Sequence, residues 1–274
     1  MLNQISKKIW DVDGELQSAF LYELATQHRN VPDFLVDKVV ADWKSEGMFV
    51  VPYSSYIAER CGLFIKQNQF GLYQGDFCYL AERLAMPLKT FNGEVIGFVG
   101  YSKVTDEDLE TDTEGNFLSI IGNVKYRYPS SLLFNKSRYL YMSGEEWINA
   151  YNTGAVVIVD GLFDKRMLNL IGIPACSLCG SNLTIYQKEY LKRIPRKIVI
   201  ADNDTAGRQL YRDCKNAFGA VELINRETKD IDEFLCKHPN NVQRLLECWE
   251  EMKKGGWRLS RSLSSKPLKS YTIN

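Results

Sequence analysis

The chain has 274 residues, 45% of them hydrophobic, and its 34 Lys and Arg balance 34 Asp and Glu, so the formal net charge is zero. This composition predicts a globular protein of one large domain or two modest ones, and it excludes a globally basic nucleic-acid-binding protein. No signal peptide is visible and no apolar run approaches the roughly 20 residues of a membrane span, so we expect a cytoplasmic protein with no membrane partner.

Apolar residues at helical spacing predict that residues 1 to 70 are mainly helical. The segment Glu15–Gln27 carries Leu16, Phe20, Leu21 and Leu24 at this spacing, and Val31–Trp43 follows the same pattern. We interpret both as faces that pack in a core, because neither segment has residues with readable chemistry.

A β-hairpin is predicted between residues 84 and 104. Asn92-Gly93 separates an apolar run around Met86 from the run Val95–Gly100, and Asn-Gly between such runs is a strong hairpin signal. Residues 106 to 114 then hold six acidic residues, which predict a solvated loop and a poor surface for nucleic acid.

Cations and aromatic residues alternate in the next segment, which contains Lys125–Pro129 and then Phe134–Tyr141. Cations neutralise phosphates and aromatic rings stack on bases, so this composition suits single-stranded nucleic acid or nucleotides. A tyrosine-rich sheet surface with ordinary lysines explains it equally well. Composition alone leaves both interpretations open.

Three short apolar runs associated with acidic residues dominate the second half of the chain. They are Val156–Val159 before Asp160, Ile198–Ala201 before Asp202-Asn203-Asp204, and Ala220–Ile224, which is followed by Asp230-Ile231-Asp232-Glu233. Such β-branched runs, bounded by breakers, indicate strands buried on both faces of a parallel sheet.

Helical segments separate these strands. They are Phe163–Leu170, Thr184–Lys192 and Ala206–Ala217, with a fourth short strand over Pro174–Leu178. Thr184 and Gln187 predict a capping box for the second helix. Alternating strands and helices predict an α/β fold with right-handed crossovers, in which the carboxyl ends of the strands meet at one edge where ligands bind.

The acidic residues are therefore expected to converge at that edge. Asp202 and Asp204 face the same side of an extended chain, and Asp164 stays near the edge if a helix starts at Gly161. Clustered carboxylates repel one another, and a hard cation such as Mg²⁺ relieves this repulsion. Two such ions can clamp the oxygens of a phosphoryl transfer. One Asp-x-Asp pair is common in α/β domains, but acids at three strand ends favour a metal site.

Cysteine-based sites are less well supported. Among seven cysteines, Cys176-x-x-Cys179 is the one close pair, and His28 and His238 are the two histidines. A fourfold zinc shell cannot be assembled locally from these residues, so we expect no structural zinc and interpret the pair as buried strand-end cysteines. Scattered cysteines without a disulfide framework suit a reducing compartment.

The C-terminal part predicts a closing helix over Val242–Met252 and then a tail, residues 253–274, with six cations and no acid. Its Gly, Ser and Pro content predicts flexibility. No Gly-x-x-x-x-Gly-Lys-Ser/Thr motif occurs, so a motor NTPase is not supported.

Several motifs together resemble the catalytic core of bacterial and phage DNA primases. The segments similar to the Toprim domain of that family are Val156–Asp164, Ser177–Thr184, the Asp-x-Asp-x-Ala-Gly element Asp202–Gly207, and Lys229–Leu235. The segments similar to the preceding polymerase core are Arg83–Leu88, Gly93–Phe98, Lys125–Ser130 and Leu133–Tyr141. The likeness covers residues 80 to 238, and its specific parts are the block Lys125–Tyr141 and the third acidic element.

The resemblance implies template-directed synthesis of short RNA primers on single-stranded DNA from ribonucleoside triphosphates. It implies a pair of Mg²⁺ or Mn²⁺ ions and no zinc. The implied catalytic metal ligands are Asp160, Asp202 and Asp204, with Asp164, Asp230 and Asp232 supporting a second ion. The implied contacts to template or nucleotide phosphates are Arg83, Lys125 and Lys136. A replicative helicase or a separate zinc-bearing protein is the expected partner, in a bacterial cell or a phage-infected host.

Three features depart from the family pattern. Asp160 stands where the family has Glu, which affects acid–base chemistry more than metal binding. Tyr101 stands where the family usually has an arginine, so one phosphate contact is missing. The sequence also lacks the zinc-binding and helicase modules of the family.

We therefore expect an α+β N-terminal subdomain (residues 1–150), a Toprim-type parallel sheet flanked by helices (151–238), and a short helical, basic tail (239–274). Primer synthesis by nucleotidyl transfer is the leading hypothesis. A Toprim-type nuclease using the same acids is the second hypothesis, and cleavage without nucleoside triphosphates would identify it. A catalytically silent replication accessory that binds DNA or a helicase is the third, favoured by Asp160 and Tyr101.

Overall fold

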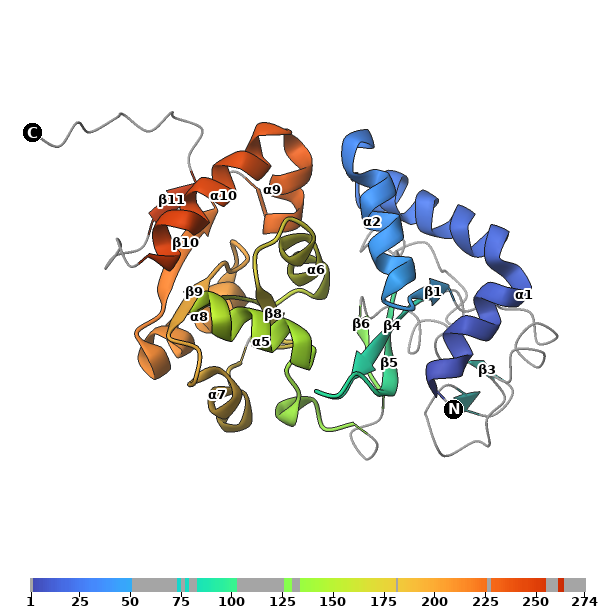
Figure 1. Ribbon diagram of the computed structural model, residues 1–274, viewed down its shortest axis with the longest axis horizontal. Coiled ribbons are helices and arrows are strands. Elements are labelled where there is room, and N and C mark those ends of the chain that lie inside the picture. The colour runs from blue at the N-terminus through green and yellow to red at the C-terminus, as the bar shows by residue number, and fades with distance from the viewer. Residues whose placement is uncertain are drawn as a thin grey trace, which may run out of the picture. The chain divides into compact units, whose positions relative to one another are not determined.

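A computed structural model (Figure 1) describes residues 2–50, 73–74, 77–78, 83–102, 126–129, 134–180, 182–225, 228–254 and 261–263. The chain divides into two compact units, Met1–Lys136 and Ser137–Asn274. The expected boundary at residue 150 falls inside helix α5 (Gly144–Thr153), and the subdomain limits stay a prediction. Within the described ranges, no helix combines the length and the apolar character that crossing a bilayer demands.

The first unit combines helices with an antiparallel sheet. Helices α1 (Leu2–Glu23) and α2 (Asp33–Ser45) are joined through the π-helical turn Leu24–His28. The four-stranded sheet has the order β1-β4-β5-β6. Its strands are β1 (Phe49–Val50), β4 (Leu84–Lys89), β5 (Val95–Tyr101) and β6 (Tyr126–Arg127), and a separate pair is formed by β2 (Tyr73–Gln74) and β3 (Phe77–Cys78).

The predicted hairpin is confirmed. Strands β4 and β5 pair antiparallel, with Leu84 opposite Tyr101. The turn closes where the Thr90 N–H donates to the Glu94 carbonyl at 2.8 Å, and Gly93 adopts a φ of 83°, which lies in the left-handed region. The Asn-Gly signal therefore worked because this turn needs a residue that tolerates positive φ. The acidic loop over residues 106–114 lies outside the described residues.

The helical N-terminus is confirmed over the described residues, but its predicted core face is partly wrong. Leu21 and Leu24 are buried, whereas Leu16 and Phe20 are 45% and 37% exposed. The cause is Gln17, which is fully buried and exchanges two hydrogen bonds with the backbone of Val50, at 2.9 and 2.7 Å. A buried amide must satisfy its donors and acceptors, and this requirement turns the neighbouring apolar side chains outward.

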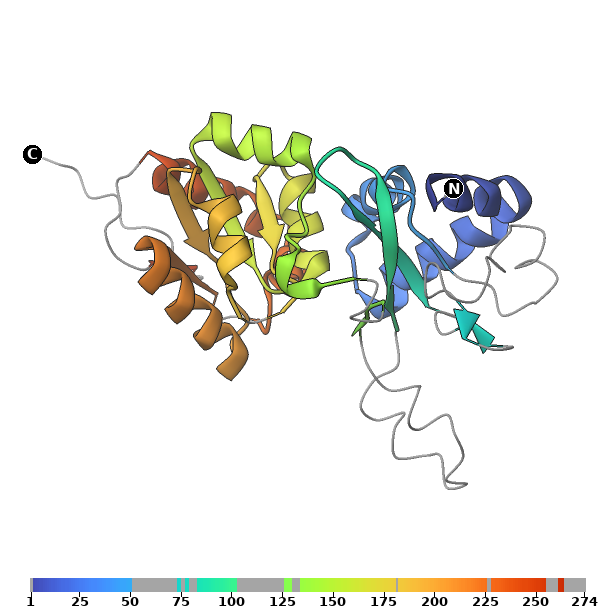
Figure 2. The same ribbon diagram turned by 90° about the horizontal axis from the view of Figure 1, so that it is seen from below.

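The second unit contains the predicted parallel sheet, and its fold class is confirmed. The strand order is β11-β10-β9-β7-β8, and Figure 2 shows helices on both sides of this sheet. Its strands are β7 (Ala155–Val159), β8 (Ala175–Ser177), β9 (Arg196–Val199), β10 (Val221–Asn225) and β11 (Arg261–Leu263). Every residue of β7 is buried, as expected for a strand covered on both faces.

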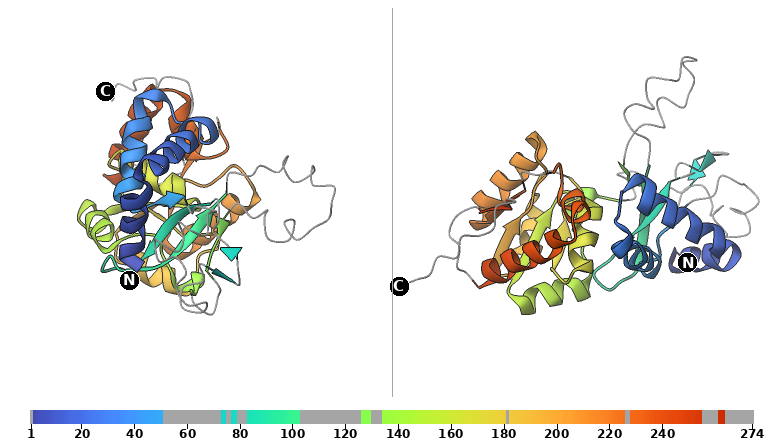
Figure 3. Two further views of the ribbon diagram at one scale, coloured as in Figure 1. Left: turned by 90° about the vertical axis from the view of Figure 1, so that its right-hand side faces the viewer. Right: turned by 90° about the horizontal axis from the view of Figure 1, so that it is seen from above.

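The predicted helices of this unit are also confirmed. They are α6 (Leu162–Leu170), α7 (Ile185–Leu191), α8 (Thr205–Phe218) and α10 (Asn240–Lys253). Helix α9 (Ile231–Lys237) was not predicted. The capping box predicted for α7 is present, with the Gln187 N–H donating to the Thr184 hydroxyl. Helices α9 and α10 pack side by side, and Figure 3 shows them in the orange and red of the C-terminal part of the chain.

The tail prediction is wrong for Arg261–Leu263, which form strand β11 parallel to β10. A strand at the edge of a sheet presents unpaired backbone groups, and pairing with β11 satisfies those of β10. This pairing joins two segments that are distant in the sequence, so the polar composition of the tail does not predict it. The remaining cations of the tail beyond Lys254 lie outside the described residues, except Arg261.

A buried group of charges links α5 to α6. Glu146 Oε1 lies 2.5 Å from the Lys165 ammonium and 3.5 Å from the Arg166 guanidinium, and it accepts a hydrogen bond from Asn169 at 2.7 Å. The side chains of Lys165 and Arg166 are only 3% and 6% exposed. Burial opposes ionisation of Glu146, but these cations and the Ser143 N–H outweigh it and lower the pKa of Glu146.

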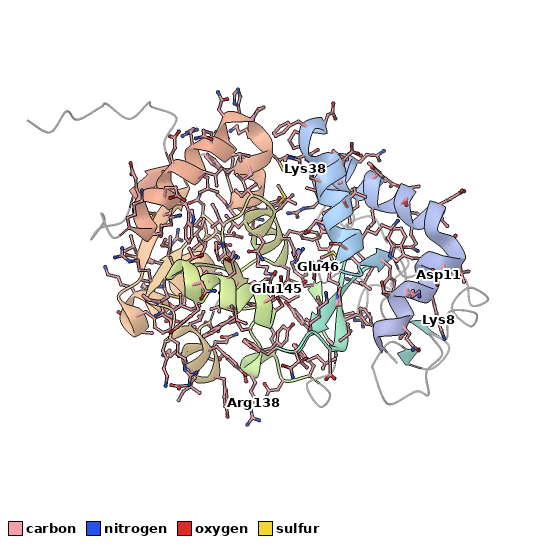
Figure 4. All side chains as sticks on the ribbon, viewed as in Figure 1. Lys8, Asp11, Lys38, Glu46, Arg138 and Glu145 are labelled. Atoms are coloured by element: carbon pink, nitrogen blue, oxygen red, sulfur yellow. The ribbon has the colours of Figure 1, made fainter. Side chains whose placement is uncertain are left out.

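We predict that Glu146→Gln lowers the free energy of unfolding by up to about 3 kcal/mol, because it removes the carboxylate that neutralises two buried cations. The control is Glu145→Gln on the same helix (labelled in Figure 4), because the Glu145 side chain is exposed. The pKa of Glu146 is lower in the folded protein than its ordinary 4.5. The difference from wild type should therefore be complete above that pH and shrink as the pH falls further. Chemical denaturation of the three proteins measures it, and equal loss in both variants would contradict it.

Candidate metal centre

The topology of the parallel sheet gives the end of β7 a special position. Strand β7 pairs with β8 on one side and with β9 on the other. The chain therefore changes direction across the sheet at β7, and ligands of open α/β sheets bind at such a point, beyond the carboxyl ends of the strands. Asp160 directly follows β7, and Asp202 follows β9 after two residues. The predicted convergence of strand ends is thus realised for these two acids.

Three predicted metal ligands form one group. Carboxylate oxygens of Asp160, Asp164 and Asp202 all lie within 4.8 Å of one another. Asp160 Oδ1 is buried and has no hydrogen-bond partner among the described residues. A buried polar atom without a partner is costly, and a cation would supply one. Hard carboxylate oxygens at this spacing fit a divalent cation that prefers oxygen ligands.

The backbone around Asp160 and Asp164 is fixed by specific contacts. The buried Ser177 hydroxyl donates to the Asp160 carbonyl at 2.7 Å, and the Asp232 N–H donates to Asp164 Oδ1 at 3.1 Å. Gly161 separates the two acids, and a Cβ there would lie 1.8 Å from Asp164 Oδ2. The carboxylate of Asp164 thus occupies the space that any other residue at position 161 would fill.

Asp202 is held by an equally close backbone contact. A Cβ at Gly207, in the first turn of α8, would lie 2.2 Å from the Asp202 carbonyl oxygen and 2.8 Å from its nitrogen. Asn203 then ties this loop to the loop after β10, since its N–H and its side-chain amide donate to the carbonyls of Lys229 and Thr228. These contacts were not predicted, although Gly207 belongs to the sequence element that was singled out.

The other three predicted acids have different surroundings. Asp204 Oδ1 accepts the Gly207 N–H at 2.7 Å and caps α8, and Asp230 Oδ1 accepts the Glu233 N–H at 2.8 Å and caps α9. Asp232 is buried in the first turn of α9. None of these three belongs to the group of oxygens within 4.8 Å in the described part of the chain. Their roles as metal ligands stay predictions.

Burial and mutual repulsion together determine the electrostatics of this group, and burial is the larger cause. Burial, and then the charges of Asp160, Asp164, Asp230 and Asp204, raise the pKa of Asp202 to about 8. Burial also raises the pKa of Asp160. In the absence of a cation, at neutral pH, the group therefore retains a proton, which belongs to the coupled carboxylates rather than to one of them. A bound cation would replace that proton.

The predicted phosphate-binding residues belong to the first unit. Arg83 is buried immediately before β4, and burial together with Arg127 lowers its pKa. Lys136 is exposed, and its ammonium lies 4.5 Å from the centre of the Tyr128 ring. Lys125 lies outside the described residues. The structure leaves the roles of all three as predictions.

Two further expectations concern Tyr101 and the cysteines. Tyr101 is buried, and the Arg29 guanidinium, which the sequence analysis missed, lies 5.9 Å from its ring centre. No pattern marks Arg29, because its partner is about seventy residues away.

Cys176 and Cys179 are both buried, as predicted. Of the residues that the structure describes, no cysteine belongs to a group able to hold a metal ion.

The chain has recognisable relatives. The Toprim-like family matches residues 157–235. The chain is 28% identical over 199 residues to the DNA primase of Myxococcus xanthus, an alignment of 69% of this chain and 30% of that protein. It is 31% identical over 160 residues to the DNA primase of Borreliella burgdorferi, and this alignment covers 57% of this chain and 26% of that protein. This chain is a relative of bacterial DNA primases with a Toprim-like domain. It spans less than a third of the length of these primases.

Solved structures share the fold of this primase relative. The RNA polymerase domain of the Mycobacterium tuberculosis primase matches with a TM-score of 0.64 and 17% identity, over 90% of this chain and 83% of that domain. The catalytic domain of a primase bound to single-stranded DNA matches with a TM-score of 0.58 and 20% identity, over 91% of this chain and 79% of that domain. The predicted likeness to a bacterial-type primase core is therefore confirmed at the level of the fold.

We predict that metal-free protein loses stability as the pH rises from about 4 to about 8, and that Asp202→Asn removes this loss. The pKa of Asp202 is about 8 in the folded protein against an ordinary 3.8. Between these values the folded state holds a proton that the unfolded state has released, so stability falls with increasing pH. Denaturant unfolding in EDTA across this range measures the slope, with Glu247→Gln on the exposed face of α10 as control. An unchanged slope in Asp202→Asn would contradict the assignment.

We predict that Gly207→Ala weakens binding of Mg²⁺ at least roughly tenfold, comparable with other changes beside metal ligands. The added methyl group would collide with the backbone of Asp202, which cannot move away as a flexible side chain can. Gly14→Ala is the control, because its new methyl would meet only Trp10, at 3.9 Å. Isothermal titration with Mg²⁺ measures the affinities. Equal affinities in wild type and Gly207→Ala would show that Asp202 does not contribute to the site.

Proposed function

We propose that this chain is the RNA-polymerising core of a DNA primase and joins ribonucleotides on a single-stranded DNA template. The observation that carries the proposal is the convergence of Asp160, Asp164 and Asp202 at the turning point of a Toprim-like sheet. The fold shared with primase catalytic domains, one of them solved with single-stranded DNA, supports the same template for this chain. In the proposed reaction, the 3′-hydroxyl of one nucleotide attacks the α-phosphate of the next and pyrophosphate leaves.

The proposed cofactor is Mg²⁺ or Mn²⁺, as a pair of ions. Its support is the set of carboxylate oxygens within 4.8 Å and the buried Asp160 Oδ1 without a partner among the described residues. Such an ion, when bound, supplies positive charge that stabilises the oxygens of the transferred phosphoryl group. Asp160, Asp164 and Asp202 would hold it. The remaining acids Asp204, Asp230 and Asp232 are proposed to support the second ion.

The cations of the first unit are proposed to bind phosphates. Arg83, Arg127 and the exposed Lys136 are described by the structure, and Lys125 completes the set in the sequence. Arg29 beside Tyr101 supplies a further guanidinium in the region where the family arginine is missing. Such contacts position a strand or a nucleotide without reading its sequence. Positioning and electrostatic stabilisation provide most of the catalysis in phosphoryl-type transfers.

The close approach of three carboxylates favours metal-dependent chemistry over a catalytically silent accessory, because acids with strongly raised pKa values cluster at functional sites. A replicative helicase or a zinc-bearing protein is the proposed partner, since no cysteine-based metal group occurs among the described residues. We propose that the protein acts in the cytoplasm of a bacterial cell, with a phage-infected host as one such setting.

We predict that Asp202→Asn and Asp204→Asn each lower primer synthesis by roughly two orders of magnitude or more, the scale expected when a charge-stabilising group is lost. The assay is synthesis of oligoribonucleotides on defined single-stranded DNA templates, with and without Mg²⁺. Glu247→Gln, an exposed change of the same kind on α10, is the control and should keep full activity. Circular dichroism checks that the variants fold.

The same experiment separates the rival functions. Metal-dependent cleavage of DNA without nucleoside triphosphates would identify a nuclease that uses the same acids. Binding of DNA without any metal-dependent chemistry would identify an accessory protein. Activity of both Asp variants within threefold of wild type, a threshold of about 0.65 kcal/mol, would contradict the metal-site assignment.

A further inference from the structure

A second candidate site lies in the first unit and involves none of the acidic residues above. It is a cavity of about 400 Å³ between the first turns of α1, the end of α2 and the β4–β5 hairpin. Its lining includes Lys7 and Trp10 from α1, Lys44 from α2, and Lys89 from β4. This volume is within the range of small-molecule sites, which run from roughly 300 to 1,000 Å³.

The walls of this cavity are held by hydrogen bonds. The Trp10 indole N–H donates to the Met48 carbonyl at 3.1 Å, which ties α1 to the segment after α2. The hairpin wall is closed by the Thr90–Glu94 backbone hydrogen bond of 2.8 Å, and the buried Phe98 also lines the cavity. The site is therefore preorganised, and a ligand would not have to order these elements on binding.

The cavity carries an excess of positive charge. Lys89 pairs with Glu46 at 3.0 Å, so these two charges cancel. Within the described residues, Lys7 and Lys44 form no ion pair with a carboxylate. The Lys44 ammonium instead lies 4.6 Å from the centre of the Trp10 ring. The carbonyl end of α2 carries partial negative charge, which disfavours an anion. The full charges of Lys7 and Lys44 exceed this partial charge and leave the cavity suited to an anionic ligand.

The aromatic ring narrows the class of anion. Lys7 and Trp10 are three residues apart on α1, so they lie on the same face of the helix. The cavity thus presents cations and an indole surface together, with the Ser6 and Ser45 hydroxyls beside them. Phosphate groups bind to clustered ammonium groups, and bases stack on aromatic rings. An inorganic anion would use the cations and leave the ring unused.

We propose that this cavity binds a nucleoside phosphate, with Lys7 and Lys44 contacting the phosphate and Trp10 contacting the base. The site lies outside residues 157–235 and shares no residue with the acidic group. Its occupancy therefore does not depend on the proposed polymerase activity or on a divalent cation. This independence makes it possible to study the cavity with the metal centre disabled.

The test is isothermal titration of the full chain with AMP in EDTA, so that binding through a divalent cation is suppressed. The double variant Lys7→Ala/Lys44→Ala should weaken AMP binding roughly tenfold or more, which is the effect of losing about 1.4 kcal/mol. The matched control is Lys8→Ala/Lys38→Ala. It removes the same charge from the same two helices, on which Figure 4 labels both residues. Neither residue belongs to the cavity lining. Trp10→Phe, which keeps an aromatic ring, should retain most of the affinity.

Three comparisons define the ligand. Adenosine and inorganic phosphate should each bind more weakly than AMP, because each lacks half of the recognised group. A 5′-phosphorylated dinucleotide that binds more tightly than AMP would support the same cavity and identify the phosphate as that of a strand end. Absence of saturable AMP binding, or equal weakening in the two double variants, would overturn the proposal. Thermal unfolding of each variant distinguishes loss of binding from loss of folding.

Discussion

The burial of three neighbouring carboxylates, those of Asp160, Asp164 and Asp202, is the constraint on which the candidate metal centre depends. Burial and the neighbouring charges raise the pKa of Asp202 to about 8, so the fold holds these groups in an arrangement that they would leave if free to move. The restraints are all rigid: the end of a fully buried strand, the Ser177 hydroxyl on the Asp160 carbonyl, and the absence of a side chain at Gly207.

Helix α6 carries opposite charges on consecutive residues, and each is stabilised by a different neighbour. Asp164, in the first turn, accepts the N–H of Asp232 from α9. Lys165 and Arg166 follow directly and contact Glu146 of α5. Asp164, Lys165 and Arg166 are all buried, so water could not replace the groups that stabilise their charges. The position of α6 is therefore fixed from both sides, and with it the position of the Asp164 carboxylate in the acidic group.

The sequence predicted the features that depend on neighbours along the chain. Buried strands follow from apolar runs, the α7 cap from Thr184 and Gln187, and the hairpin turn from Asn92-Gly93. The contacts that it missed join distant segments. Gln17 reaches the backbone of Val50, Arg261–Leu263 complete an open sheet edge, and Glu146 pairs with Lys165. The acidic group was predicted in part. The strand ends predicted the positions of Asp160 and Asp202. The close packing of Asp164 against Gly161 and of Asp202 against Gly207 was not predicted, and it brings the carboxylate oxygens near one another.

The shared proton changes the meaning of Asp160 in place of the family glutamate. The shorter side chain reduces its reach by about 1.5 Å, yet Asp160 Oδ1 is the oxygen without a partner among the described residues. The proton resides on the coupled carboxylates, and the pKa of Asp202 is raised to about 8. The group therefore holds a proton near neutral pH without a glutamate at position 160. A cation that binds must displace the shared proton, so its affinity increases as the pH rises towards 8. In the proposed metal centre, Asp160 would serve as a ligand and would share the coupled proton with Asp202 when no cation is bound.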